Sequence, residues 1–592
     1  MKRLFSLWPL AIPLCCLFTV AAAPQAGAQI SVNSANPNNT AQGTVNLDVS
    51  VSGNGFKKGA KAQWFVTGTT NPGGVTVNST TFNNSGQLTA NITVSDTATT
   101  GGFDIQVTNS DGRTGKGTEL FAIKTKGASA CIVPTPLNIV PAATACAGSS
   151  GSTCLDSTFG NAIALPPGGL VLTNTDGSVP SVNDLDTAQA VFPQQMPDGT
   201  ARILAIGTTT NPNVSGQQGI ALVRYNTDGT LDTLFGTGGI ARFFPTTIGG
   251  SSVRDGALDP SGNALAIMDA AGTTILARFT PQGLPDTTFH SSGYVSLSTL
   301  KPLAMVLQAD GKIVVAGTRI VSKAVVGSVV RFNPNGSLDT SFGSAGQVNL
   351  NSLSLLYSVA LQTVNSQQYI LAGGGAASAA AFSMARLTPS GALDTSFGSS
   401  AGYSTTDFCG TGSTIFSVNV DTAGNILAGG TAALVANGPP KFGIARFDRN
   451  GLLDTTFGDP STGGLTRSGR TLVDFYGYRN FIMSVRPVLD VNGNQVGYLA
   501  AGYAGQSTGP FTQNQYLVVV RFNLDGLLDT TFGTNGSGGL AIDFGGANNF
   551  VMKPAEHNTF VQSDGRIITV GTSGFVSGSN AGANFALARV WQ

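Results

Sequence analysis

The amino-acid sequence predicts an all-β protein in which a small β-sandwich precedes a seven-bladed β-propeller. Three observations point to this fold. Short runs of alternating apolar and polar residues follow a leader segment, a six-residue motif recurs seven times along the rest of the chain, and Gly makes up 78 of the 592 residues. Short strands separated by frequent turns are typical of sandwiches and propellers, and Gly supplies those turns.

Residues 1–28 predict a secretory signal peptide. Lys2 and Arg3 precede a mostly apolar stretch that ends near residue 23, and small residues 26–28 form a cleavage site. We expect a bacterial exported protein, whether secreted, periplasmic or on the cell surface. A membrane anchor is the alternative, and a lipoprotein signal at Cys15 is disfavoured by the bulky Leu14 before it. No later apolar run is long enough to predict a transmembrane segment.

Residues 29–125 predict the β-sandwich. Residues 45–49, 88–94 and 103–107 alternate between apolar and polar side chains, and a turn follows at 109–112. Short strands with frequent turns over about 95 residues are typical of a sandwich. Segments 52–56 and 107–112 resemble bacterial immunoglobulin-like domains of the IPT/TIG kind, so we expect an immunoglobulin-like β-sandwich here.

Residues 126–153 predict a cysteine-containing linker. Signal removal leaves Cys131, Cys146, Cys154 and Cys409, and the linker region is rich in Ala, Gly, Ser and Pro. Four cysteines allow three pairings, and an exported protein is expected to oxidise them. Proximity favours the pair Cys131–Cys146. A metal site is the alternative, but no histidine lies nearby in the sequence.

Residues 154–592 contain seven copies of a motif close to Leu-Asp-Thr-Thr-Phe-Gly. Its aspartates are Asp156, Asp232, Asp286, Asp339, Asp394, Asp454 and Asp529. An Arg, usually before an aromatic residue, ends a β-run in each repeat, at Arg224, Arg278, Arg331, Arg386, Arg446, Arg521 and Arg589. A third feature is a turn followed by an apolar strand, as in residues 310–317. The motif spacing averages about 62 residues, the size of one supersecondary unit.

Each repeat is expected to hold four short antiparallel strands. In the third repeat these are residues 294–297, 303–308, 313–316 and 328–332. Seven such units predict a seven-bladed propeller. An open solenoid is the alternative, and the uneven repeat lengths disfavour it.

Together, these three features resemble the delta-60 repeat family of bacterial exported proteins. The resemblance covers about three quarters of the chain. It departs locally at Pro285 and His290, and at residues 365–368 where a Gly turn is expected. It implies a propeller-like architecture on a secreted or surface protein, and it implies no defined activity.

The recurring Arg and Asp residues are expected to be structural. Because an Arg fork can bind a carboxylate with two hydrogen bonds, each pair can join neighbouring strands. The alternative is a ring of ligand sites, one per repeat. Packing demands the same residue in every repeat, whereas a ligand ring would vary from repeat to repeat, so we favour the structural role.

Composition excludes several classes of function. Lys and Arg (31) balance Asp and Glu (31), so we expect neither a nucleic-acid partner nor a polybasic membrane contact. The sequence has two histidines, His290 and His557. Because acid–base chemistry and metal binding use such residues, we expect no catalytic residue, metal or cofactor.

The candidate binding residues lie in the irregular sixth repeat. Asp474, Tyr476, Tyr478 and Arg479 belong to a segment that is simpler in the neighbouring repeats, and Tyr and Arg are enriched in binding sites. Packing at a blade edge is the other interpretation. We expect an exported, non-enzymatic binding or adhesion protein for an extracellular protein or glycan. The alternative is a propeller enzyme, namely a lyase, lactone hydrolase or quinone-cofactor dehydrogenase with its site in the central channel.

Overall fold

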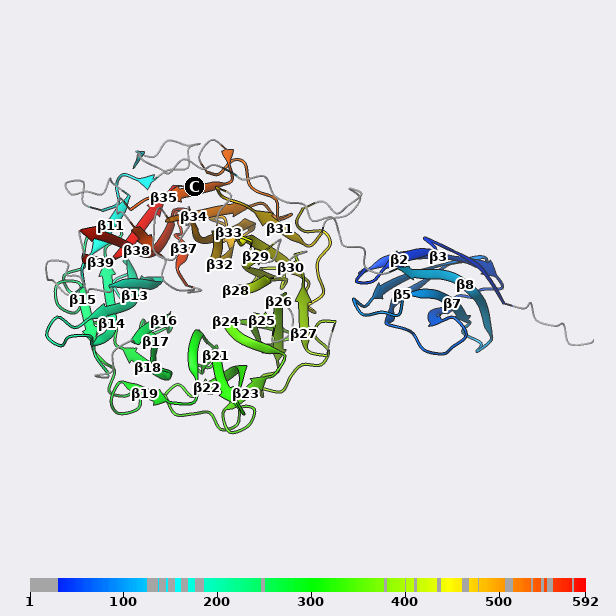
Figure 1. The fold of residues 1–592 in the computed structure, drawn as a ribbon, viewed down its shortest axis with the longest axis horizontal. Coiled ribbons are helices and arrows are strands. Elements are labelled where there is room, and N and C mark those ends of the chain that lie inside the picture. The colour runs from blue at the N-terminus through cyan, green and yellow to red at the C-terminus, as the bar shows by residue number, and fades with distance from the viewer. Residues whose placement is uncertain are drawn as a thin grey trace, which may run out of the picture. The chain divides into compact units, whose positions relative to one another are not determined.

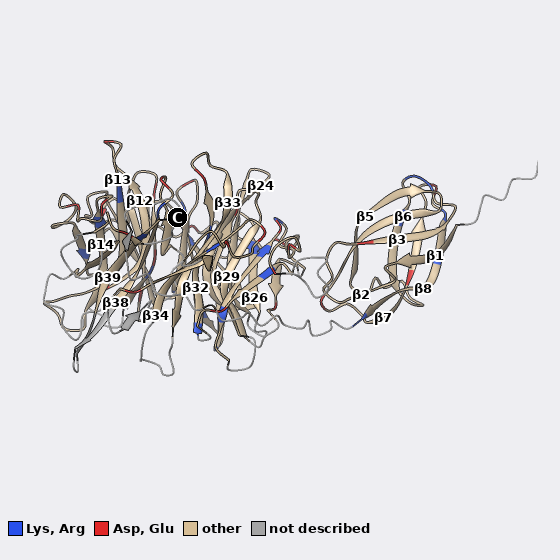
Figure 2. Ribbon diagram, turned by 90° about the horizontal axis from the view of Figure 1, so that it is seen from above, with Lys and Arg blue, Asp and Glu red and all other residues tan. Residues whose placement is uncertain are grey.

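The computed structural model divides the chain into two compact units, Met1–Gly127 and Ala128–Gln592. It describes residues 30–124, 137, 145–146, 155–160, 169–175, 186–245, 251–376, 381–399, 401–408, 412–433, 438–459, 468–476, 479–505, 515–533, 536–544, 548–550, 557–577 and 580–591. All four cysteines of the expected mature chain fall where no side chain is described, so the disulfide prediction lies outside these residues. Figure 2 shows sparse charged residues on both units.

The first unit contains two four-stranded sheets. One has the order β1 (Ser31–Asn36), β3 (Leu47–Asn54), β6 (Gln87–Val94), β5 (Val75–Asn84), and the other has the order β2 (Asn39–Ala41), β8 (Thr114–Lys124), β7 (Gly101–Thr108), β4 (Lys61–Val66). β2 and β8 pair in parallel, whereas the other neighbours are antiparallel.

Both sheets of the first unit share one hydrophobic core. Trp64 from β4 is buried and meets Phe121 from β8 edge to face, with ring centroids 5.9 Å apart, while Leu88 and Ile92 enter the core from β6. β6 alternates buried and half-buried residues along its whole length. This period of two indicates a strand with one face on a core and the other toward water. The immunoglobulin-like assignment itself stays a prediction.

The second unit is a β-propeller, in which sheets follow one another around a ring (Figure 1). Six sheets have four antiparallel strands each, numbered here in chain order. Sheet 1 is β12 (Thr187–Gln195), β13 (Ala201–Thr210), β14 (Gln218–Tyr225), β15 (Ile240–Phe243); sheet 2 is β16 (Ser251–Leu258), β17 (Ala264–Ala270), β18 (Thr273–Phe279), β19 (Tyr294–Leu297); sheet 3 is β20 (Lys301–Leu307), β21 (Ile313–Val321), β22 (Ala324–Phe332), β23 (Gln347–Leu350). Sheet 4 is β24 (Leu353–Val364), β25 (Gln367–Ala376), β26 (Phe382–Leu387), β27 (Tyr403–Thr406); sheet 5 is β28 (Gly412–Val420), β29 (Ile426–Ala433), β30 (Lys441–Phe447), β31 (Arg470–Val473); sheet 6 is β32 (Arg479–Leu489), β33 (Gln495–Gly505), β34 (Gln515–Phe522), β35 (Gly539–Ile542).

A seventh sheet joins the two ends of the second unit. It contains β36 (Asn548–Phe550), β37 (Thr559–Val561), β38 (Ile567–Ser577), β39 (Asn580–Val590), β9 (Ala145–Cys146), β10 (Leu155–Asp156) and β11 (Leu170–Thr173). β11 comes from the start of the unit and pairs antiparallel with β39 at the end of the chain. The ring is therefore closed by backbone hydrogen bonds between segments about 400 residues apart in sequence. Almost the whole propeller lies between these two segments.

The sheets are offset by one strand from the four strands expected for each sequence repeat. Residues 294–297 were expected to share a sheet with 303–308, yet β19 pairs with β18 of sheet 2, while β20 begins sheet 3. That grouping of strands is wrong. The offset leaves one outer strand unmatched at the start of the repeats, and this strand, β11, completes sheet 7.

Hydrophobic cores lie between neighbouring sheets all the way around the ring. Leu222 of sheet 1 packs in the same core as Met268 of sheet 2, and Leu587 of sheet 7 packs with Val223 of sheet 1. Strands between two cores are buried on both faces, as in β14, whose residues after the first are all buried. Such strands read as continuous apolar runs rather than alternating ones.

No helix in the described part of the chain has the length and apolar character that a membrane crossing needs.

Candidate functional site

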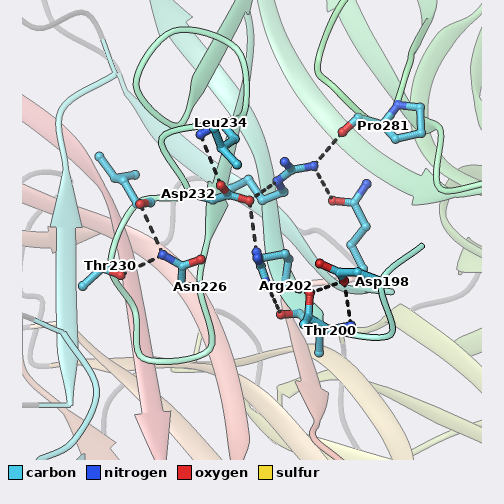
Figure 3. Close-up of polar contacts among 12 residues, drawn as sticks. Asp198, Thr200, Arg202, Asn226, Thr230, Asp232, Leu234 and Pro281 are labelled. Carbon is cyan, nitrogen blue, oxygen red and sulfur yellow. Dashed lines mark hydrogen bonds and ion pairs between the residues drawn. The ribbon is translucent and has the colours of Figure 1, made fainter. Parts of the chain in front are cut away.

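The repeated Arg and Asp form one recurring contact, which we call the Arg–Asp junction. Figure 3 shows the junction around Asp232, whose Oδ2 accepts hydrogen bonds from Arg224 Nε at 2.9 Å and Arg202 Nε at 3.0 Å. The Asp232 amide also donates to the Arg224 carbonyl at 2.9 Å. Across the seven junctions the Arg Nε to Asp Oδ2 distance is between 2.7 and 3.0 Å.

Among the described residues, the Arg of six of the seven junctions also donates to a backbone carbonyl in a turn of the next sheet. Arg224 also donates to the Pro281 carbonyl of sheet 2 at 2.6 Å, and its guanidinium stacks 4.5 Å above the Phe235 ring. The turn glycine Gly283 of sheet 2, with a φ of +84°, lies so close to that ring that a Cβ would approach it to 2.7 Å. The motif Phe is thus held between an Arg of its own sheet and a Gly of the following sheet.

The junction also closes the ring. Arg589 follows the last motif, so its partner is Asp156 at the start of the repeats, with Nε to Oδ2 at 2.7 Å. Asp156 has no exposed surface, and the Arg589 side chain is 3% exposed. Burial alone would raise the pKa of Asp156, but hydrogen bonds from Thr158 and the charges of Arg589 and Arg566 hold it below its usual value. This junction thus links the end of the chain to the start of the repeats, and the structural role of all seven pairs stays a prediction.

The structure does not gather the four residues of the sixth-repeat candidate site into one exposed cluster. Asp474 is 2% exposed and forms an ion pair with Lys441 at 2.7 Å, while its Oδ1 accepts a hydrogen bond from Asn480 at 3.0 Å. Tyr476 is half-buried against Tyr516, with ring centroids 5.6 Å apart. Arg479 is exposed, and Tyr478 lies outside the described residues. Blade-edge packing accounts for Asp474 and Tyr476, and a binding role for this segment stays a prediction.

A second set of equivalent residues lies on the strands that border the centre of the ring (Figure 1). In each of the six four-stranded sheets the first strand has a β-bulge at the corresponding place, and the extra residue is unpaired in the ladder. Register with β38 puts His557 at this place in sheet 7. We call these residues the ring-centre positions: Gln189, Arg254, Leu303, Tyr357, Phe416, Met483 and His557. Bulges commonly redirect side chains next to functional sites.

Aromatic side chains follow one another across sheets 4, 5 and 6 at this level. Tyr357 meets Phe416 edge to face at 4.8 Å between ring centroids, and Phe416 lies 6.2 Å from Phe481. Phe481 stacks on Tyr503 at 4.7 Å. Burial raises the pKa of the Tyr357 hydroxyl, and Arg254 partly opposes that rise. Tyr357, Phe481 and Tyr503 are half-buried, whereas Phe416 between them is buried.

Polar side chains take the corresponding places in sheets 7, 1 and 2. His557 Nδ1 lies 2.8 Å from Asp255 Oδ1, and the imidazole packs on Phe192 of the intervening sheet at 5.3 Å between centroids. Asp255 has no exposed surface, whereas the His557 side chain is 20% exposed. Next to Asp255, Arg254 donates to Asp269 at 2.6 Å. The ring centre therefore has an aromatic side and a polar, charged side.

The sequence analysis missed this His557–Asp255 pair. The two residues are 302 positions apart. One signal was present: at the place of Asp255 the fourth and fifth sheets carry Ser358 and Ser417, so a carboxylate there departs from the pattern. Without the register of the inner strands, that correspondence could not be seen.

Among the described residues, no three His, Cys, Asp or Glu side chains come close enough to hold a metal ion.

Family comparison supports propeller repeats. Residues 197–235, 308–342, 370–397, 424–457 and 503–532 match the model of a family described as "Domain of unknown function (DUF5122) beta-propeller". Every matched segment ends at the Phe of the repeated motif. The delta-60 name and the immunoglobulin-like domain stay predictions. No curated protein matches the chain.

Solved structures give weak similarities only. Drosophila Plexin A in complex with Semaphorin 1b is 10% identical, with 69% of this chain and 88% of that chain covered and a TM-score of 0.32. The PQQ-bound aldose sugar dehydrogenase from Streptomyces coelicolor is 11% identical, with coverage of 57% and 94% and a TM-score of 0.31. Puromycin hydrolase is 14% identical, with coverage of 74% and 62% and a TM-score of 0.31. These similarities decide nothing between a binding protein and an enzyme.

Proposed function

We propose that this chain is an exported, non-enzymatic binding protein that recognises a glycan at the centre of its propeller ring. The observation that carries the proposal is the aromatic series Tyr357, Phe416, Phe481 and Tyr503, which extends over three consecutive sheets. Aromatic faces bury large apolar areas with few side-chain torsions to fix, and they suit the apolar faces of sugar rings. The expected signal peptide supports export.

A glycan array with the full mature chain tests the proposal. We expect specific capture of a subset of glycans, lost in Tyr357→Ala and in Phe416→Ala. Leu234→Ala is the matched control, because Leu234 is 87% exposed at a motif far from the aromatic series in the fold and should leave capture unchanged. Equal capture by all variants, or capture of proteins but no glycan, contradicts the proposal.

A propeller enzyme is the second candidate, and the His557–Asp255 pair is the observation that favours it. A carboxylate that orients an imidazole is an arrangement that general bases use. Mass spectrometry of the captured glycan after incubation separates the two functions. Unchanged glycan supports a binding protein, whereas glycan shortened by hydrolysis or elimination, in a reaction that is lost with His557→Gln, supports an enzyme.

A further inference from the structure

Asp255 does more than hold two sheets together. Ser358 Oγ accepts the Val418 amide of the next sheet at 2.8 Å, and Ser417 Oγ accepts the Val485 amide at 3.1 Å. At the equivalent place Asp255 Oδ2 accepts the Met305 amide at 3.0 Å. In sheets 4 and 5 a serine is therefore sufficient for this inter-sheet bond, whereas Ser484 Oγ at the same place in sheet 6 has no hydrogen-bond partner among the described residues. The carboxylate of Asp255 adds a buried charge and a second oxygen, which is the one that faces His557.

The imidazole of His557 is fixed with one edge toward the ring centre. Its backbone carbonyl accepts the Val191 amide at 2.7 Å, and its ring rests on Phe192. Nδ1 faces a carboxylate without exposed surface, and the His557 side chain as a whole is 20% exposed. A carboxylate oxygen accepts, so Nδ1 donates to Asp255 and Nε2 is the ring nitrogen left for a ligand.

In the neighbouring ion pairs the cationic side chains are more exposed than the carboxylate that they share. Asp269 is 7% exposed, whereas Arg254 and Lys301, which both approach it at 2.6 and 3.8 Å, are 13% and 54% exposed. Arg254 Nε is buried and has no hydrogen-bond partner among the described residues. The donors that a group from solvent can meet here are therefore the exposed part of the Arg254 guanidinium and the Lys301 ammonium. Guanidinium groups bind carboxylates well because their geometry allows two parallel hydrogen bonds.

We propose that the ring centre selects acidic sugars, namely uronic acid residues. Arg254 and Lys301, which share Asp269 as a partner, bind the sugar carboxylate, His557 Nε2 hydrogen-bonds a sugar hydroxyl, and Tyr357, backed by the buried Phe416, covers a face of the ring. This inference rests on the proposed function and names the class of glycan that the same site takes. Asp255 is a positioning residue, which acts through His557.

Calorimetry with paired probes tests the inference. The probes are tetragalacturonate and tetramannuronate, each beside its methyl ester, which keeps the sugar backbone and removes the charge, at about 0.15 M salt to screen distant surface charges. We expect one acid to bind at least tenfold more tightly than its ester. Arg254→Gln should remove this preference, so that acid and ester bind with similar affinity.

Asp255→Ser is the informative second variant. It restores the residue found at this place in sheets 4 and 5, so the bond to the Met305 amide is kept while His557 is released. We expect an unchanged melting temperature and at least a fivefold weaker affinity for both acid and ester, because the lost contact is to a hydroxyl. An unchanged affinity overturns the role of His557.

The failures of the two proposals are distinguishable. If a neutral glycan binds as tightly as the acids and Arg254→Gln changes nothing, acidic-sugar selection is wrong and glycan recognition stands. If neither the array nor these probes show binding that depends on Tyr357, both proposals are wrong.

Discussion

The Arg–Asp junctions and the ring-centre positions each occur once per sheet, yet they differ in one respect. The junctions repeat the same Arg, Asp and Phe around the ring, whereas the ring-centre positions hold a different residue in every sheet. A contact between sheets must satisfy the same geometry each time, so its residues are the same. The proposed ligand surface has no such constraint, so its residues can differ from sheet to sheet.

Among the changes considered, Arg589→Ala is expected to lower the free energy of unfolding most. Its partner Asp156 would remain as a buried carboxylate with Arg566 alone beside it, and loss of one member of a buried pair costs about 3–5 kcal/mol of unfolding free energy. Arg521→Ala is the control, because Arg521 and Asp529 are 19% and 16% exposed and should contribute less. Denaturant unfolding measures both. Equal losses would show that burial does not set the strength of a junction.

Acid should weaken the junctions next. Burial alone would raise the pKa of Asp339, but hydrogen bonds from Ser341 and Lys312, together with Arg331, lower it well below its usual value. The stabilisation is therefore fully present above pH about 4, the range of an unfolded Asp, and is lost as the pH falls below it. The melting temperature of Asp339→Asn should be lower than that of the parent at pH 7. Below pH 4 it should fall less steeply with pH than that of the parent. Parallel pH profiles would contradict the assignment.

A glycine pair gives a smaller and cleaner test. Gly391 and Gly424 both have φ near +85°, so Ala at either costs about 1–2 kcal/mol in backbone strain. A Cβ at Gly391 would also lie 2.9 Å from the Phe342 ring of the preceding junction, whereas nothing lies within 4 Å at Gly424. We expect Gly391→Ala to lower the melting temperature more than Gly424→Ala. The reverse order would mean that the junction Phe can move freely.

The smallest effect on stability is expected at the ring centre. Tyr357 is half-buried and loses mainly its edge-to-face contact with Phe416, so Tyr357→Ala should cost about 1 kcal/mol. The same change should abolish glycan capture. A large loss of stability without loss of capture would place Tyr357 among the structural residues and end the contrast between the two sets.

Local repetition in the sequence was sufficient to predict much of the fold. The Arg and Asp of a junction such as Arg331 and Asp339 are only eight residues apart, so one turn brings them together in every repeat. Turn glycines and apolar runs likewise act within a single repeat, and they predicted an all-β propeller. The predicted grouping of strands into sheets was wrong, because β19 pairs with β18 and not with the strand that follows it in the sequence.

The tertiary structure decided what depends on closing the ring. Arg589 and Asp156, which form an ion pair, are 433 positions apart in the sequence, and β11 from the start of the unit pairs with β39 in sheet 7. His557 of sheet 7 contacts Asp255 of sheet 2, with sheet 1 between them. Lys441 similarly neutralises Asp474, which the sequence had placed in a binding segment. The repeating unit could be predicted from the sequence, because turns and strands depend on neighbouring residues. Which side chains meet at the ring centre depends on the number and register of the sheets between them, and this is fixed only when the first and last strands pair.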